Sequence, residues 1–287
     1  EGKIYWVPTT VSAFGLYCNE DLLKKHKQKT PGNLKEWESV CSYFTKKGIT
    51  PVICNNDISL KTLAVGRGFY SVYQQNNQKQ VFENLNNGKE KLSRYLTPGF
   101  DLAQSLIQQG YIDPDKSLKT EKTSDDLEEF AKGKSPFMLT GAWAAGRVKT
   151  MNPDLKFSVS PLPLLENGSM LVVNADTRLS VNADSRHVKA AEMFVEYFTQ
   201  AENIQKFSDQ QCSFSPLKGG KPSSVEEIRP LLSCYKDGKT VIGTDSMLKL
   251  PIWNLTAEAS KQILSGKPVR SVMNRMDRQA EKERKVQ

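Results

Sequence analysis

The sequence predicts a soluble α/β fold, and three observations lead to this prediction. Strand-like and helix-like segments alternate through the first half of the chain, which is typical of α/β proteins. Hydrophobic residues make up 38% and charged residues 25% of the 287 positions, as in ordinary globular domains. Mean hydropathy is −0.51, and no apolar run approaches the length of a membrane span.

The first half of the chain carries these signals in turn. Residues 3–7 read as a strand that ends at Pro8, and residues 11–19 as a second, mostly buried strand. Asn33 and Glu36 have the spacing of a capping box, and apolar residues at helical spacing follow them. The other expected elements are a helix at 21–29, a helix at 34–47, a buried strand at 49–55, a helix at 58–73, a loop at 74–80, helical segments at 92–96 and 100–110, and a helix at 124–133.

The second half begins with a strand and ends in helices. Asn167-Gly168 is a hairpin signal, and Asp184 or Ser185 is a suitable cap for the amphipathic helix that follows. The expected elements are a strand at 135–140, a helix at 141–151, a strand at 156–165, strands at 169–174 and 178–182, a helix at 187–199, a helical turn at 202–210, a helix at 223–238 interrupted at Pro230, and helices at 252–266 and 268–285.

The charges and cysteines exclude several classes of function. The net charge is +8, but lysine and arginine are scattered and do not alternate with aromatic residues, so no nucleic-acid partner is predicted. No cysteine pair has CxxC spacing, which argues against zinc or thioredoxin-like chemistry. Cys41 with Cys54 and Cys212 with Cys234 could form disulfides in an oxidising compartment, and buried free thiols are the alternative.

Catalytic and cofactor motifs are missing from the sequence. The only histidines, His26 and His187, stand among charged residues at helix starts, which indicates surface positions. There is no phosphate-binding loop, no dinucleotide fingerprint and no nucleophile elbow. The sequence therefore predicts no catalytic residues, no metal and no cofactor.

The tryptophans carry the strongest binding signal. Trp37 lies on the apolar stripe of its helix and is expected in the core. Trp143, in TGAWAAGRVKT, directly follows a predicted strand, and Trp253, in LPIWNLT, precedes a helix. Strand-to-helix junctions line ligand crevices in α/β sheets, and an indole there can stack on the apolar face of a sugar. The alternative is that both rings fill the core.

Several blocks, taken in order, resemble one family. They are KIYWVPTTVSAFGLYCNEDLL, TPGNLKEWESVCSYFTKKGITPV, FAKGKSPFMLTGAWAAGRVK, MNPDLKFSVSPLPLL and LSVNADSRHVKAAEMFVEYFT. Their order and spacing resemble those of the extracellular solute-binding proteins of bacterial ABC sugar importers, the group that includes maltose-binding protein. The resemblance covers nearly the whole chain.

The resemblance implies an α/β, two-lobe periplasmic-binding-protein-like fold of type II, in which hinge crossovers join the lobes and sugar binds between them. Residue 1 would lie near the first crossover, so the first lobe would be incomplete and the chain N-terminally truncated. The implied division is 1–13 for the end of lobe 1 and the first crossover, 14–173 for lobe 2, 174–235 for the returning part of lobe 1, and 236–287 for the hinge and C-terminal helices of lobe 2. Hinge closure on the ligand is the expected motion.

The resemblance also implies a set of ligand-binding residues. Trp143 and Trp253 match aromatic positions at the cleft, and Gly141 leaves room for the first of these rings. The other implied contacts are Ser12 and Thr10 at the first crossover, Asn55 and Asp57 after a strand, and Asn174, Asp176 and Arg178 in the hinge segment.

Two departures from the family pattern bear on the ligand. NADTR stands where relatives have a glycine-rich hinge, and Thr140 stands where they have asparagine. Arg178 and Asp176 would suit a substituted or acidic glycan, and an ion pair that packs the hinge is the alternative.

The expected function is capture of a sugar or oligosaccharide for an ABC transporter permease by a monomeric, non-enzymatic protein without cofactors or direct membrane insertion. The expected location is extracellular, with a lipid anchor on a Gram-positive cell, or periplasmic. The alternatives are a carbohydrate-active enzyme with Asp57 and Asp176 as its carboxylate pair, and a sugar-sensing accessory protein of a membrane kinase.

Overall fold

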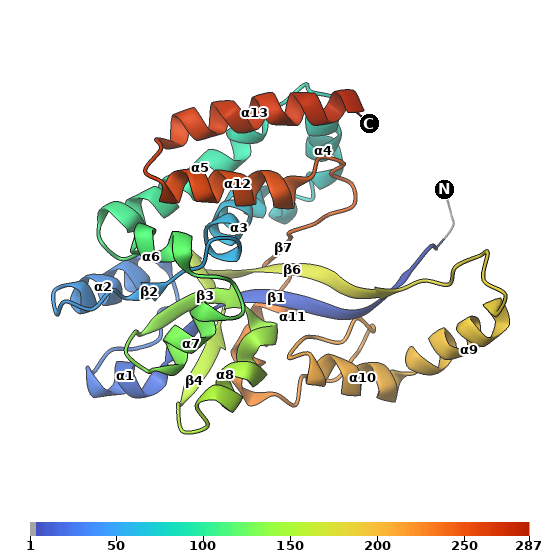
Figure 1. Cartoon of the computed structure of the whole chain (residues 1–287), viewed down its shortest axis with the longest axis horizontal. Coiled ribbons are helices and arrows are strands. Elements are labelled where there is room, and N and C mark those ends of the chain that lie inside the picture. The colour runs from blue at the N-terminus through green and yellow to red at the C-terminus, as the bar shows by residue number, and fades with distance from the viewer. Residues whose placement is uncertain (1–3, 287) are drawn as a thin grey trace.

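A mixed β-sheet with helices on both faces forms the centre of the molecule (Figure 1), as shown by a computed structural model that describes residues 4–286. The predicted α/β class is confirmed. The strand order is β2-β3-β1-β6-β5, with β4 beside β1 and β7 beside β6. The strands are β1 (Val7–Asn19), β2 (Val52–Ile53), β3 (Phe137–Gly141), β4 (Phe157–Ser160), β5 (Leu162–Leu165), β6 (Gly168–Leu179) and β7 (Thr240–Ile242).

Helices occupy most of the remaining chain. They are α1 (Glu20–Lys25), α2 (Leu34–Thr45), α3 (Ile58–Gln74), α4 (Gln78–Asn86), α5 (Leu92–Gln108), α6 (Pro114–Lys119), α7 (Asp125–Ala131), η1 (Ala142–Ala144), α8 (Ala145–Met151), α9 (Val188–Phe198), α10 (Ala201–Gln210), η2 (Glu226–Leu231), α11 (Leu232–Lys236), α12 (Ile252–Leu264) and α13 (Val269–Val286). The predicted Asn33 cap is confirmed, because its side chain accepts a hydrogen bond from the Glu36 amide at 2.9 Å.

Alternation along β1 divides the core between the two faces of the sheet. Phe14, Leu16 and Cys18 belong to the cluster formed with α2, α3, α5, α12 and α13. Ala13 and Tyr17 belong to a second cluster with side chains from α7, α8 and η2. Successive side chains of a strand point to opposite faces, so one strand supplies both cores.

The directions of the strands place several strand-to-helix connections at one edge of the sheet. β3 and β6 both run antiparallel to β1, while β2 runs parallel to β3 and β7 parallel to β6. The carboxyl ends of β2, β3, β6 and β7 therefore point in the same direction. Side chains that follow these ends can converge there, as in other α/β proteins.

Several predicted boundaries were wrong; for example, α5 runs unbroken through Pro98 and joins the helical segments predicted at 92–96 and 100–110. The strand predicted at 3–7 is not found at 4–6, and residue 3 lies outside the described residues; β1 instead starts at Val7 and continues through Pro8 to Asn19, near the end of the sheet, where a missing N–H costs little. β6 likewise runs through Asp176 to Leu179 without a break, because β1 pairs with it as far as Val7. The polar stretch predicted as a loop at 74–80 ends in the first turn of α4.

All five cysteines are buried free thiols, so the disulfide alternative was wrong. Burial raises the pKa of Cys18 and Cys54 to about 12, which keeps both side chains protonated at neutral pH. Protonated, buried thiols are poor nucleophiles. The cysteines therefore serve as small apolar core residues.

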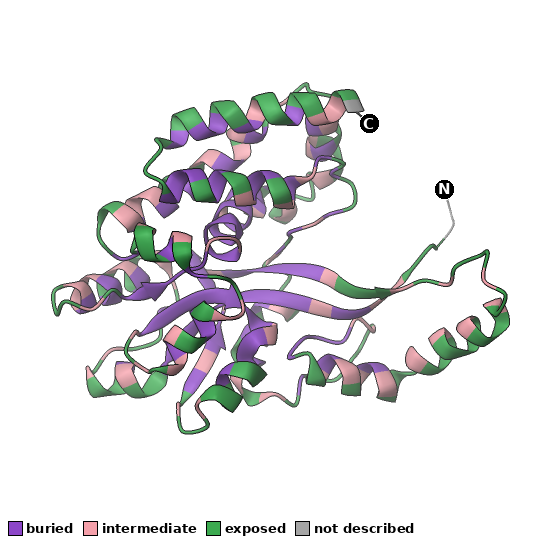
Figure 2. Cartoon of the chain, in the orientation of Figure 1, coloured by how far each residue is buried: buried purple, intermediate pink, exposed green. Residues whose placement is uncertain are grey.

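The segment around α9 differs from the rest of the chain. No described residue of α9 is buried, and Met193, Phe194 and Tyr197 are 69%, 55% and 61% exposed. Figure 2 shows α9 and the outer ends of β1 and β6 with little buried surface, whereas the inner halves of both strands are buried. η2 and α11, by contrast, pack on the main body, with η2 against β4 and α11 against β6.

None of the helices within residues 4–286 is both long and apolar enough to cross a membrane.

Candidate functional site

A cavity of about 340 Å³ opens where β2, β3 and β7 end, and the second half of β6 lines one side of it. Its aromatic wall consists of Phe14 from β1, Trp143 from η1 and Trp253 from α12. We call this cavity the tryptophan cleft. A volume of this size falls at the lower end of the range for small-molecule sites.

The three aromatic rings of the tryptophan cleft pack on one another. The Phe14 and Trp143 ring centroids are 5.1 Å apart in an edge-to-face arrangement, and the Phe14 and Trp253 centroids are 5.2 Å apart with tilted planes. Both tryptophans are partly buried and also line the cavity. They therefore combine the two roles that the sequence left open, since each ring packs against the core and also meets the cavity.

Gly141 places the Trp143 ring. A Cβ atom at Gly141 would lie 2.1 Å from the Cη2 and Cζ3 atoms of Trp143. The backbone of Gly141 is in an ordinary extended conformation, so the glycine is required for space and not for backbone freedom. The indole lies directly over the end of β3 because position 141 has no side chain.

β6 supplies the polar wall through Asn174, Ala175, Asp176 and Arg178. The Asn174 side-chain oxygen accepts hydrogen bonds from the Thr244 amide at 2.9 Å and the Thr244 hydroxyl at 3.1 Å. These bonds fix the amide orientation and leave the Asn174 NH₂ group without a partner among the described residues. Asn174 can therefore donate hydrogen bonds into the cleft.

Arg178 and Asp176 form no ion pair with each other in the described structure. The Arg178 guanidinium lies 4.3 Å from the ring centroid of Trp6 and donates two hydrogen bonds to the Ala175 carbonyl. The alternative of an ion pair that packs the hinge was therefore wrong. Both charged groups remain exposed at the cavity wall.

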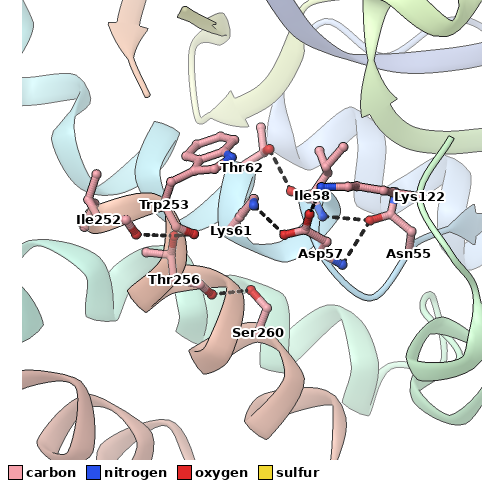
Figure 3. Close-up of polar contacts among 10 residues, drawn as sticks. All are labelled: Asn55, Asp57, Ile58, Lys61, Thr62, Lys122, Ile252, Trp253, Thr256 and Ser260. Atoms are coloured by element: carbon pink, nitrogen blue, oxygen red, sulfur yellow. Dashed lines mark hydrogen bonds and ion pairs between the residues drawn. The ribbon is translucent and has the colours of Figure 1, made fainter. Parts of the chain in front are cut away.

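A charged cluster stands behind Trp253 (Figure 3). The Asp57 carboxylate pairs through one oxygen with Lys61 and through the other with Lys122. The Lys61 ammonium also lies 4.4 Å from the Trp253 ring centroid, and Lys61 is only 1% exposed. Lys122 comes from the loop between α6 and α7 and lines the cavity together with Thr123.

Burial raises the pKa of Asp57, but hydrogen bonds and charge attraction from Lys122 and Lys61 outweigh this effect, so its pKa lies below the ordinary value. Burial lowers the pKa of Lys61, and the Asp57 carboxylate offsets only part of this effect. At neutral pH Asp57 is therefore ionised, and both of its oxygens are bound to ammonium groups.

Of the predicted contacts, Gly141 and Asp57 are not among the residues that line the cavity, and three others lie behind its wall. Thr10 is 1% exposed and donates to the Asp176 carbonyl at 3.2 Å. Ser12 is 2% exposed, and its hydroxyl has no hydrogen-bond partner among the described residues. Asn55 is also 1% exposed. In this structure none of the three lines the cavity, whereas Trp143, Trp253, Asn174, Asp176 and Arg178 do.

Asn55 holds the start of α3 in place. Its side-chain oxygen accepts from the Ile58 amide at 2.7 Å, and its NH₂ group donates to the buried Asp126 carboxylate at 2.8 Å. Burial raises the pKa of Asp126, although hydrogen bonds from Asn55 and two backbone amides oppose this effect. Asn55 therefore stabilises the turn that carries Asp57.

We expect Asn55→Ala to lower the free energy of unfolding by about 1–2 kcal/mol, because it removes the acceptor for the Ile58 amide and a donor to a buried carboxylate. Chemical denaturation measures this loss. Asn56→Ala is the matched control, since Asn56 makes a single 3.3 Å bond to the Leu118 carbonyl. Equal denaturation midpoints for the two variants would contradict the supporting role of Asn55.

Sequence reasoning missed Phe14, Lys61 and Lys122. Phe14 lies in the middle of a strand, where an aromatic residue reads as core, and Lys61 and Lys122 are charged side chains that read as surface. Only the two lysines carried a signal in the sequence, because each lies within a few residues of the start of a predicted helix. Within residues 4–286 no group of three or more His, Cys, Asp or Glu side chains could hold a metal ion.

The fold and the tryptophan cleft define an α/β protein of the ligand-binding class. A family model of bacterial extracellular solute-binding proteins matches residues 1–224, and the chain belongs to this family. The chain has the mixed α/β fold of the two-lobed solute-binding proteins.

Individual relatives are sugar-binding proteins by name. The multiple sugar-binding protein of Streptococcus mutans serotype c is 27% identical over 241 residues, which cover 80% of this chain and 55% of that protein. A sugar transporter protein from Bacillus licheniformis in complex with stachyose has a TM-score of 0.70 and 20% identity, with 100% of this chain and 74% of that chain covered. The solute-binding protein RafE in complex with raffinose has a TM-score of 0.75 and 21% identity, with 98% and 74% covered. The chain thus spans little more than half the length of the curated sugar-binding relative.

Proposed function

We propose that this protein captures a sugar or oligosaccharide in the tryptophan cleft and delivers it to an ABC transporter permease. The observation that carries the proposal is the pair of tryptophans that both pack against Phe14, at the edge of the sheet where β2, β3 and β7 end and β6 runs on. Aromatic faces stack on the apolar faces of sugar rings, and Asn174 adds a directed donor for hydroxyl groups. The names of the relatives point to the same ligand class.

The charges at the cleft favour binding over catalysis. A glycosidase needs one carboxylic acid with a raised pKa beside a second carboxylate. Asp57 instead has a lowered pKa, and ammonium groups bind both of its oxygens, while Asp176 is exposed. This arrangement suits a non-enzymatic protein.

We further propose that the outer halves of β1 and β6 are the hinge crossovers, with lobe boundaries near residues 13 and 174. The two strands pair from Val7–Leu179 to Phe14–Val172 and run from the buried core to the exposed region near α9 (Figure 1). Because η2 and α11 pack on the main body, the return crossing would come before residue 226. Closure of the hinge would cover a sugar from the side opposite the tryptophans.

The expected location is outside the cell membrane, where the family acts, and we propose attachment through a lipid anchor on a Gram-positive surface. We also propose that the protein works as a monomer, with the permease as its partner. These assignments follow from the family and from no particular residue of the cleft.

A glycan panel tests the proposed function. Neutral and acidic oligosaccharides of two to five units are screened by tryptophan fluorescence and thermal shift, and hits are incubated with the protein and checked for cleavage. We expect at least one oligosaccharide to change the fluorescence and raise the melting temperature, with no products formed. Hydrolysis of a hit would favour an enzyme, and the absence of any hit would contradict sugar capture.

A further inference from the structure

The charged groups around the tryptophan cleft are not balanced. Three cations, Lys61, Lys122 and Arg178, meet two carboxylates, Asp57 and Asp176. Lys61 and Lys122 share the single carboxylate of Asp57, and Lys261 adds further repulsion at Lys61. The cleft therefore carries an excess of positive charge.

Lys122 is the cation that can move toward a ligand. Its side chain is 51% exposed and lines the cavity, whereas the Lys61 side chain is 2% exposed and confined between Asp57 and Trp253 (Figure 3). The Lys122 end of its pair with Asp57 is exposed to solvent, which screens the attraction, so moving Lys122 away costs less than breaking a fully buried pair. Asp57 would keep Lys61 as its partner throughout, and no buried carboxylate would be left without a counter-charge.

The uncommitted hydrogen-bonding groups of the cleft are mostly donors. The Asn174 NH₂ group and the indole N–H groups of Trp143 and Trp253 have no partner among the described residues, and Lys122 and Arg178 have N–H groups to spare. Among the described residues that line the cavity, the exposed Asp176 is the only carboxylate, and it accepts one hydrogen bond from the Thr177 amide. Sugar hydroxyls both donate and accept, whereas a carboxylate only accepts.

We propose that the tryptophan cleft selects a sugar that carries a carboxylate, such as a uronic acid unit, and that Lys122 recognises this carboxylate. This proposal rests on the proposed function. The tryptophans hold the apolar face of the ring, and Asn174 binds an adjacent oxygen. Lys122 turns from Asp57 to the ligand carboxylate as the sugar enters. The ligand thereby supplies the negative charge that the cleft lacks.

Matched oligosaccharides that differ only at C6 test this proposal. Each neutral member has a CH₂OH group where its acidic partner has a carboxylate, as in galactotriose and trigalacturonate or in cellobiose and its glucuronate-ended analogue. Affinities are measured by calorimetry at pH 7 in low and high salt. We expect the acidic member to bind at least tenfold more tightly at low salt, and the ratio to fall as salt screens the charge.

Lys122→Met should remove most of the preference for the acidic partner while leaving the affinity for the neutral sugar within about twofold, and Lys122→Arg should retain the preference. Lys119→Met is the matched control, because it removes the same charge three residues away, on an exposed position that does not line the cavity.

Equal affinity of the unmodified protein for the acidic and the neutral sugar would overturn the acidic-sugar proposal and leave sugar capture intact. If Lys122→Met binds the neutral sugar and the acidic sugar both more weakly, Lys122 supports the structure of the cleft and does not recognise the carboxylate. Binding of neither sugar, nor of any other member of the glycan panel, would overturn both proposals.

Discussion

Trp143→Ala should lower the affinity for the best-bound oligosaccharide of the panel by roughly 30-fold or more, equivalent to about 2 kcal/mol. The indole is one of two that line the cavity, and its edge-to-face contact with Phe14 holds it in place. Removing the ring would leave the ligand with one tryptophan instead of two. Calorimetric titration measures the loss, and fluorescence from the remaining tryptophans reports on the fold.

The Trp143→Ala substitution also separates the two roles of Trp143, sugar binding and core packing. The ring packs against both core clusters, so we expect a stability loss of about 1–3 kcal/mol, smaller than for a fully buried tryptophan. Trp143→Phe is the conservative comparison, because it keeps an aromatic face in the cleft and should retain part of the affinity. Unchanged sugar affinity in Trp143→Ala, together with a large loss of stability, would show that the ring only fills the core.

Gly141→Ala should reduce sugar affinity tenfold or more without removing any ligand-binding group. The new methyl group would overlap the Trp143 ring atoms, so the indole must leave its position over the end of β3. Overpacking of this kind costs about 1–3 kcal/mol of stability. Thermal unfolding and calorimetric titration on the same sample measure both effects.

Gly146→Ala is the control for this substitution. Gly146 lies in α8, five residues further along the chain, and a Cβ there would sit 3.4 Å from the Cys212 sulfur, an ordinary contact. Alanine favours a helix over glycine by up to about 1 kcal/mol, so this variant should keep its affinity and be at least as stable as the parent. If Gly141→Ala also binds sugar like the parent, the position of the Trp143 ring does not determine affinity.

Both predictions concern a site feature that local sequence already indicated. Trp143 follows a strand and opens a helical turn among small residues, and this pattern predicts an indole at a strand end. The Asn33 cap and the buried Trp37 were predictable for the same reason, because each depends on residues within one or two helical turns. The α/β class followed from the order of such local signals.

What the sequence by itself determined was therefore the class of fold, most of its helices and the tryptophan at the cleft. The tertiary structure decided that β1 and β6 are single long strands, that Asn55 supports a turn, and that Phe14 belongs to the aromatic wall of the cleft. It also decided the charge of the site, since Asp57 and Lys122 are 65 residues apart in the chain. Contacts of this kind depend on how strands and loops come together in space, and burial, not local pattern, sets the cost of every charge placed there.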